Sequence, residues 1–346
     1  MFEKVNPGHP DKMADRLSGA IVDLVYERAG GLTKANPRVA CEVMAGHGRV
    51  DVQIETSLGR MDLRAEDIDP LIRRLFGERV EGNVLIAPQD AHLSDNQTRG
   101  LRCGDNGIFK GCPPTDEQRV LTAIAATMWE RFKSDGKYLL GRYLPNHKKA
   151  IGERGRDQIV PSDEDTQSYA VTICQSNATY DEILKTFHDF FEGNGGGKVS
   201  PHVSSLKAKD GLTKYYSALI NPLGPWTGGI DVDCGCTNRK LGSDMGDGVT
   251  GGGLMGKDLS KADVSVNIVC YLKAVASGQV VTACCSIGDE HVTFTYASGK
   301  TETETFADVV EMARLYIITD CGGSFERFSE WGLIRPKGLL NIERIK

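Results

Sequence analysis

Apolar side chains recur at a helical spacing in three long stretches of the chain. The first stretch runs from Asp11 to Arg28, and the others begin after Thr115 and near Ser260. Each stretch predicts an amphipathic helix, because residues three and four apart share one helix face. The three apolar stripes are formed by Met13, Leu17, Ile21, Leu24 and Val25, by Leu121, Ile124, Met128 and Phe132, and by Val264, Ile268, Leu272 and Val275.

Alternating or continuous apolar runs lie beside these helices and predict strands. The first round holds a hairpin of RVACEVMA and RVDVQIETS joined by GHG, a helix around Pro70 to Phe76, and a short buried strand, GNVLIAP. In the second round, Thr115 and Gln118 form a capping box before the long helix, and strand SYAVTIC and helix TYDEILKTFHDFF follow. The third round holds strands QVVTACCSI and EHVTFTY, which turn at GDE, and the helix ETFADVVEMARLYI.

The order of long helix, antiparallel strands and second helix therefore occurs three times. We interpret the chain as an α+β protein of three structurally similar domains with pseudo-threefold symmetry. The predicted domains are an N-terminal one over 1–98, a central one over 113–224 and a C-terminal one over 225–346, with segments exchanged between them. The connection from Gly193 to Lys198 predicts a flexible surface linker, whereas the glycine-rich connection from Val249 to Asp258 runs directly into charged residues.

Composition restricts the class of protein. The chain has 346 residues and a formal net charge of -6, which argues against a general nucleic-acid binder because phosphate neutralisation needs a basic excess. No apolar run is long enough for a transmembrane helix, and the start of the chain lacks a basic region followed by an apolar stretch. The ten cysteines show no CxxC and no zinc-finger spacing. We therefore expect reduced, buried thiols in a cytoplasmic protein with no membrane or nucleic-acid partner.

Four polar clusters rich in glycine interrupt the apolar pattern. They are GHPDK (8–12), CGDNG (103–107), DCGCTNRK (233–240) and GGGLMGKDLSKAD (251–263). Glycines let backbone amides approach an anion, and cationic side chains supply point charges for a polyphosphate. Magnesium usually takes only one or two carboxylates, with phosphates and waters in the rest of its shell. The candidate cations are Arg239, Lys240, Lys257 and Lys261, and the candidate metal ligands are Asp11 and Asp263.

Each of these residues also has a simpler explanation. Asp11 is well placed to cap a helix, Lys257 and Lys261 suit a solvated helix face, and His9 alone could be an N-terminal histidine without a catalytic role. The glycines from Gly251 to Gly253 match neither the P-loop nor GxGxxG. The combination of four charged, glycine-flanked segments in one acidic chain favours a site for a polyanion and a divalent cation.

Together these strings resemble the S-adenosylmethionine synthetase (methionine adenosyltransferase) family. GHPDK is the N-terminal signature of that family, RVACE resembles the hairpin strand after it, and CGDNG resembles its GDQG. The stretch from Ile220 to Lys240, with INPLG, GG and DCGCTNRK, is similar to the family's INP-x-G…GG…D-x-G-x-T-G-RK. GGGLMGKDLSKAD is very similar to the family's GGGAFSGKDPxKVD, which is highly specific. The resemblance runs in the same order along nearly the whole chain.

The resemblance implies the family's fold of three similar α+β domains and a homodimer with active sites between its subunits, with a tetramer as an alternative. It also implies synthesis of S-adenosylmethionine from ATP and L-methionine. In that reaction the sulfur attacks the ribose C5′, the whole triphosphate leaves, and the triphosphate is then hydrolysed to phosphate and pyrophosphate. Two Mg²⁺ ions and a K⁺ ion assist. Since a neutral thioether attacks carbon, the protein must supply alignment and positive charge rather than a strong base.

The family's site residues carry over by motif position. The resemblance implies that His9, near the leaving oxygen, is catalytic together with Arg239 and Lys257. It implies Mg²⁺ ligands at Asp11 and Asp263 and a K⁺ ligand at Glu42. The residues implied for methionine are Glu55, Gln97 and Asp233, and those implied for ATP or its triphosphate are Lys12, Asp105, Asp233, Arg239, Lys240, Lys257 and Lys261.

The chain departs from the family pattern in two places near these residues. The loop from Gln97 to Gly104 is short where the family carries a longer mobile gate, so the site is expected to be more open or differently gated. The family's D-x-K-[ST]-Q-V appears as DEDTQSY, which puts Asp165 in place of an active-site lysine. A carboxylate beside a triphosphate is repulsive unless it binds metal or turns away, and Lys148 or Lys149 could substitute for the missing charge.

Asp165 keeps two other functions open. One is an enzyme of another reaction class, a polyphosphate (triphosphate) hydrolase or an altered adenosyltransferase. The other is a non-catalytic homologue that binds ATP and regulates a longer synthetase. The retained His9, Asp11, Asp263 and cationic cluster favour a working synthetase over both.

Overall fold

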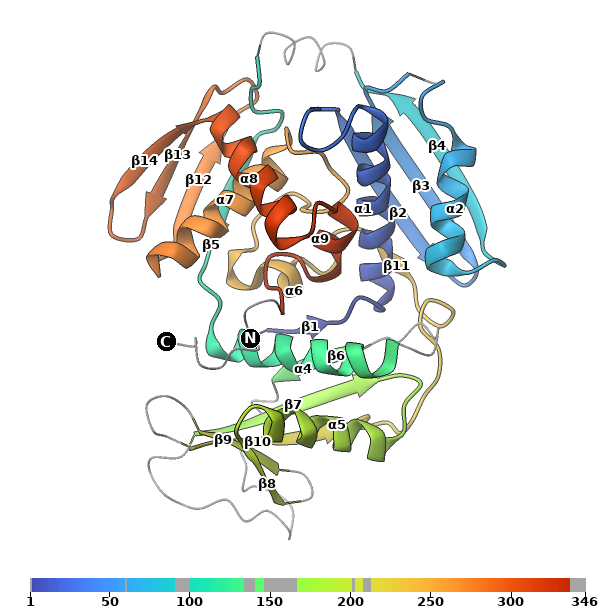
Figure 1. Ribbon diagram of the computed structural model, residues 1–346, viewed down its shortest axis with the longest axis vertical. Helices are drawn as coiled ribbons and strands as arrows, with labels where there is room; N and C mark the ends of the chain where they lie inside the picture. The colour runs from blue at the N-terminus through green and yellow to red at the C-terminus, as the bar shows by residue number, and fades with distance from the viewer. Residues whose placement is uncertain are drawn as a thin grey trace. The chain divides into compact units, whose positions relative to one another are not determined.

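The computed structural model describes residues 2–59, 61–90, 100–133, 141–145, 167–200, 203–207 and 213–336 (Figure 1). The described chain is a mixture of helices and three sheets, so the predicted α+β class is confirmed. It divides into two compact units. Unit 1 comprises Met1–His9, Thr115–Gly229 and Ile334–Lys346, and unit 2 comprises Pro10–Pro114 and Ile230–Leu333.

The first sheet of unit 2 has the strand order β11-β2-β3-β4. Strands β2 (Val39–Gly46) and β3 (Arg49–Thr56) form the predicted antiparallel hairpin. Helix α2 (Ala65–Phe76) then leads to β4 (Glu81–Pro88), which runs parallel to β3. The outer edge of β2 is covered by β11 (Gly235–Cys236), which comes from far along the chain. This exchanged strand brings one of the four polar clusters to the sheet.

One face of this sheet packs on the long helix α1 (Pro10–Arg28). Side chains alternate along β2, so that Val39, Cys41 and Val43 are buried while Glu42 and Met44 are exposed on the opposite face. This is the pattern of a sheet with one covered face. Helix α9 (Phe325–Trp331) packs on α1 in turn.

The second sheet of unit 2 has the order β14-β13-β12-β5 and is antiparallel throughout. Its helix α7 (Ala262–Ser277) packs closely on β5, where a Cβ on Gly111 would lie 2.1 Å from the Cys270 carbonyl oxygen. Two further helices, α6 and α8, complete this part of unit 2 (Figure 1). The bounds are β5 Gly107–Gly111, α6 Leu241–Met245, β12 Val281–Cys285, β13 His291–Tyr296, β14 Thr301–Thr305 and α8 Phe306–Asp320.

Unit 1 holds a six-stranded sheet with the order β1-β6-β7-β10-β9-β8. Its helices α4 (Asp116–Phe132) and α5 (Tyr180–Gly193) both begin with a capping box. The box of Thr115 and Gln118 was predicted, and Thr179 with Glu182 forms the second. The strand bounds are β1 Lys4–Val5, β6 Gly141–Pro145, β7 Gln167–Gln175, β8 Gly197–Ser200, β9 Val203–Lys207 and β10 Thr213–Ile220.

The three sheets share a construction. In each, a segment distant in sequence pairs antiparallel with the first strand of an antiparallel pair: β11 with β2, β1 with β6, and β5 with β12. In the sheets of β2 and β6, the last strand of the round follows a helix and pairs parallel, β4 with β3 and β10 with β7. In the sheet of β12, β14 precedes a helix and pairs antiparallel with β13. The ranges predicted for the three domains remain a prediction.

Two expectations about local structure are wrong. The strand GNVLIAP, expected to be buried, has no buried residue, because β4 is an edge strand. The connection from Gly193 to Lys198, expected to be a linker, already enters β8 at Gly197.

All ten cysteines are free thiols, and five of them are buried. In the described ranges no helix is both long and apolar enough to cross a bilayer.

Candidate functional site

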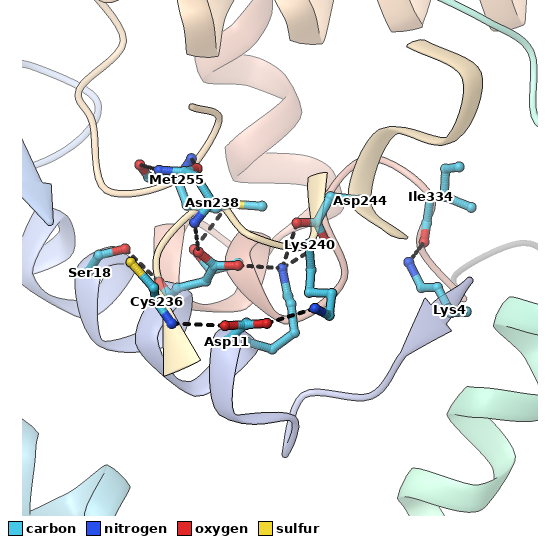
Figure 2. Close-up of polar contacts among 12 residues, drawn as sticks. Lys4, Asp11, Ser18, Cys236, Asn238, Lys240, Asp244, Met255 and Ile334 are labelled. Atoms are coloured by element: carbon cyan, nitrogen blue, oxygen red, sulfur yellow. Dashed lines mark hydrogen bonds and ion pairs between the residues drawn. The ribbon is translucent and has the colours of Figure 1, made fainter. Parts of the chain in front are cut away.

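The carboxylate of Asp11 meets the DCGCTNRK cluster at the start of α1 (Figure 2). Its Oδ1 accepts a hydrogen bond from the Cys236 backbone N–H at 2.9 Å, and its Oδ2 accepts one from Lys240 Nζ at 2.7 Å. The Arg239 guanidinium lies 3.5 Å from Oδ1. Asp11 is therefore more than a helix cap, because it pairs with both cations of the neighbouring cluster.

A glycine makes this approach possible. A Cβ on Gly235 would lie 2.0 Å from the carbonyl oxygen of Pro10, closer than any side chain allows. The glycine in DCGC therefore lets the loop before Arg239 lie directly against the first turn of α1.

Behind Asp11 lies a buried ion triplet of Lys12, Asp15 and Asp244. Lys12 Nζ donates to Asp15 at 3.0 Å and to both oxygens of Asp244 at 2.7 and 2.8 Å. Burial opposes the charged ammonium, but the two carboxylates more than offset this and raise the pKa of Lys12. Burial raises the pKa of Asp15 to about 6, against the lowering effect of Lys12. In this arrangement the Lys12 ammonium is enclosed by protein, and its contact with a triphosphate stays a prediction.

The GGGLMGKDLSKAD cluster supplies two further ion pairs. Lys257 Nζ lies 2.8 Å from Asp263 Oδ2, and Lys261 Nζ lies 3.5 Å from Asp105 Oδ1. Both lysines precede α7 and keep only 17% of their side chains exposed, so they do not form a solvated helix face. Burial raises the pKa of Asp105, Lys261 lowers it, and the nearby charge of Asp263 raises it further. The motif residues 105, 257, 261 and 263 thus share one charged region.

A glycine again permits the close packing. Gly252 has a φ of +84°, and a Cβ there would lie 2.2 Å from Asp263 Oδ1. The backbone of the glycine run therefore lies directly against a candidate metal ligand, and a larger residue at this position would displace the carboxylate.

Both site loops attach to the same outer edge of β2. The Thr237 backbone N–H donates to the Val43 carbonyl at 3.0 Å, while Gly256 accepts from Cys41 at 2.7 Å. Lys257 forms an isolated antiparallel bridge with Ala40. Glu42 lies on β2 between these two attachments, and its Oε2 accepts a hydrogen bond from the Thr237 hydroxyl. One strand edge therefore aligns two clusters that are distant in sequence.

The other predicted residues lie in several environments. Glu55 on β3 shares the exposed sheet face with Glu42, since Glu42 pairs with Gln53 and Glu55 with Ala40. Asp233 is exposed and accepts from the Cys234 backbone N–H at 2.8 Å. His9 belongs to unit 1, where it is buried and its backbone N–H donates to the Asn6 carbonyl at 3.1 Å. Gln97, Asp165, Lys148 and Lys149 lie outside the described residues.

The oxygen donors of the two clusters fit the metals that the resemblance implies. Within the described part of the chain, no group of three or more His, Cys, Asp and Glu side chains could hold a metal ion by itself. Asp11 and Asp263 each offer one carboxylate with a lysine beside it. This fits a hard cation that takes one or two protein ligands and completes its shell with phosphates and waters. Glu42 and the Thr237 hydroxyl offer the oxygen ligands that a larger monovalent cation accepts.

Sequence reasoning missed three residues of this region. Nothing in the sequence distinguishes Asp15 and Asp244 from aspartates on the exposed face of a helix. Asn238 does give a signal in the sequence, because asparagine tolerates the left-handed conformation better than most residues with a side chain, and its φ is 62°. The family pattern has a glycine at this position.

Comparisons with known proteins agree with this fold and these motifs. Residues 1–75 match the family described as S-adenosylmethionine synthetase, N-terminal domain. The S-adenosylmethionine synthase of Bradyrhizobium sp. strain ORS 278 is 27% identical over 289 residues, which cover 76% of this chain and 69% of that protein. The corresponding protein of Jannaschia sp. is 28% identical and covers 81% of this chain and 73% of its own length.

One solved structure supports the fold independently. It is described as an unusual S-adenosylmethionine synthetase from Campylobacter jejuni, with a TM-score of 0.57 and 16% sequence identity. The similarity covers 99% of this chain and 92% of that one. The fold is thus similar to that of a solved S-adenosylmethionine synthetase, and two loops bring paired carboxylates and cations to one strand edge. In sequence, the chain is similar to the S-adenosylmethionine synthases at 27–28% identity, as its motifs indicated.

Proposed function

We propose that this protein synthesises S-adenosylmethionine from ATP and L-methionine. The observation that carries the proposal is that four motif cations, on two loops attached to β2, pair with the three motif carboxylates Asp11, Asp105 and Asp263. Before a ligand binds, each cation of the site is paired with a carboxylate, so that the opposite charges largely cancel. A triphosphate with its metal can exchange partners with them, because it brings both anionic oxygens and cationic charge.

Arg239, Lys240, Lys257 and Lys261 would bind the triphosphate and stabilise the negative charge that it gains as the C5′–O bond breaks. The methionine sulfur forms the new bond to C5′, and the oxygen leaves with the triphosphate. Positive charge held in place where this charge develops lowers the barrier, since the protein does not reorganise during the step. His9 is proposed to donate a hydrogen bond to the leaving oxygen.

Asp11 and Asp263 would hold the two Mg²⁺ ions, and Glu42 would hold K⁺. Bound Mg²⁺ would supply charge neutralisation on the phosphate oxygens in both the transfer and the later hydrolysis of the triphosphate. Asp105 and Asp233 would contact the nucleoside or the methionine, with Glu55 and Gln97 on the methionine. We further propose a homodimer with active sites at its interface and a cytoplasmic location, which the ten free thiols support.

Product analysis tests the proposal. The full chain is incubated with ATP, L-methionine, Mg²⁺ and K⁺, and the products are identified by mass spectrometry. We expect S-adenosylmethionine, orthophosphate and pyrophosphate in equal amounts. Loss of ATP without S-adenosylmethionine would contradict the proposal.

The polyphosphate hydrolase remains the second candidate, because Asp165 replaces the expected lysine. Methionine-independent release of phosphate from tripolyphosphate, at a rate equal to that with methionine, would favour it. An Asp165→Lys variant that gains S-adenosylmethionine synthesis would show that the missing lysine limits the parent protein.

A further inference from the structure

We propose that Asn238 is a positioning residue that holds the two cationic arms of the site at a fixed separation. The first arm is the segment with Arg239 and Lys240, and the second is the segment with Lys257 and Lys261. The proposal rests on the proposed function only for the identity of the ligand, a linear polyphosphate long enough to contact both arms.

The side-chain amide of Asn238 joins the two arms directly (Figure 2). Its Oδ1 accepts a hydrogen bond from the Met255 backbone N–H at 2.8 Å, and its Nδ2 donates to the Met255 carbonyl at 3.3 Å. The side-chain amide thus pairs with both the N–H and the carbonyl of Met255, as a residue of a neighbouring strand would. A Cβ on Gly253 would lie 2.5 Å from Nδ2, so the glycine run is shaped to admit this amide.

The positions of these bonds in sequence explain their effect. Asn238 is followed at once by Arg239 and Lys240, and Met255 stands two residues before Lys257. Met255 is buried, and Gly256 beside it accepts from Cys41 on β2. A displacement of either loop at the amide would therefore move cations of that arm by a similar distance.

The backbone of Asn238 is anchored as well. Its N–H donates to Asp15 Oδ1 at 2.8 Å, and Asp15 belongs to the buried triplet with Lys12. The left-handed φ of 62° lets the main chain turn toward Asp15 while the side chain points to Met255. The residue therefore connects the first turns of α1, the first arm and the second arm.

Unit 1 contains a matched control. Asn177 has a φ of 55°, its Nδ2 donates to the Gly228 carbonyl at 3.0 Å, and its Oδ1 accepts from the Gly228 N–H at 3.2 Å. Asn177 and Asn238 thus share their conformation and a pair of side-chain bonds to one residue, and Asn177 Nδ2 also donates to Ser176 Oγ at 3.3 Å. Glycine at either position removes both bonds and keeps a backbone that tolerates the left-handed region.

The test compares Asn238→Gly with Asn177→Gly in the full chain by calorimetric titration of tripolyphosphate with Mg²⁺, at a temperature where both variants are folded. Both variants are expected to melt a few degrees lower than the parent, because two net hydrogen bonds are lost. Only Asn238→Gly should bind tripolyphosphate more weakly, by about tenfold, with a parallel rise in KM for ATP and a smaller change in kcat. The proposal would be overturned if neither variant lost affinity for tripolyphosphate relative to the parent, or if both lost it equally.

A measurement on the parent protein covers the case in which Asn238→Gly does not fold. In the ligand-free protein, the Met255 N–H should exchange with solvent as slowly as amides of β2. Exchange at the rate of an unprotected loop would mean that the amide does not hold the arms together, and would overturn the proposal.

Synthesis of S-adenosylmethionine by the parent is assayed in parallel. If none forms while Asn238→Gly alone weakens tripolyphosphate binding, the positioning role stands and the proposed function fails. If S-adenosylmethionine forms and the affinities do not differ, the positioning role fails and the proposed function stands. A parent that binds no tripolyphosphate contradicts both.

Discussion

Two groups of lysine–aspartate pairs in unit 2 differ in their exposure to solvent. In the triplet of Lys12, Asp15 and Asp244, the side chains are 1%, 0% and 0% exposed. In the pairs of the second arm, Lys257 and Asp263 are 17% and 11% exposed, and Lys261 and Asp105 are 17% and 28% exposed. The residue types are the same, but only the second group can meet a ligand without opening the protein.

This difference assigns the two groups different tasks. Charges that are fully buried must keep their partners, because a lone charge in the interior is strongly destabilising. Charges that still reach solvent can exchange their partner for a phosphate or a metal without opening the protein. The triplet is therefore expected to stabilise the fold around α1 and α6, and we propose that the half-buried pairs bind the ligand.

The largest expected effect is on stability, from Lys12→Met. Removing the ammonium leaves Asp15 and Asp244 buried without their cation, and the free energy of unfolding should fall by about 3–5 kcal/mol. Urea denaturation of the variant and the parent measures this. The matched variant Lys261→Met should lose less than about 1 kcal/mol, and equal losses in the two variants would remove the distinction between the groups.

The next effect is on activity, from Asp263→Asn. The variant loses a carboxylate charge that we assign to Mg²⁺, and the rate of S-adenosylmethionine formation should fall by about a hundredfold. Its melting temperature should stay within a few degrees of the parent. The control is Asp189→Asn on the exposed pair with Lys185. If Asp263→Asn matched the parent at saturating Mg²⁺, the metal assignment would be wrong.

A smaller effect concerns pH and involves Asp15. Its pKa is raised from 3.8 to about 6 in the folded protein, so the folded state holds this proton more tightly than the unfolded state. The contribution of Asp15 to stability is therefore full below about pH 4 and is lost as the pH rises to about 6. Denaturation curves at several pH values should show this decrease in the parent and a flatter profile in Asp15→Asn. An identical profile in the variant would mean that another group titrates.

The smallest effect is expected at an exposed pair of unit 1. Lys185 lies 2.5 Å from Asp189 in α5, with side chains 75% and 55% exposed. Lys185→Ala should change the free energy of unfolding by less than about 0.5 kcal/mol and leave the synthesis rate unchanged. A larger loss in stability would show that exposure alone does not separate the groups.

Local pattern was sufficient to predict the longer helices and some of the strands. The apolar stripe of α1, the hairpin of β2 and β3, and the capping box of Thr115 were visible because they depend on neighbours in sequence. The pairing of β11 with β2 was not visible, since two residues 190 positions away carry no periodic signal. The short elements β14 and α9 were missed, and so were the strands β5, β6, β8, β9 and β10.

The site was predicted by motif more than by pattern. Lys12 and Lys257 looked equivalent in sequence, because burial depends on the segments that pack around each side chain. The role of Asn238 depends on a φ value and on Met255, which lies 17 residues further along the chain. Neither relation follows from composition or spacing, although the departure from glycine at this position could have drawn attention to it.

Cleavage of the C5′–O bond with loss of the whole triphosphate is the central claim, and one isotope measurement tests it most directly. The protein is incubated with methionine, Mg²⁺, K⁺ and ATP that carries ¹⁸O in the bridge between C5′ and the α-phosphorus. The account predicts S-adenosylmethionine with all of the ¹⁸O in the inorganic phosphate products. Label retained on an adenosine product, or phosphate release that is independent of methionine, would contradict it.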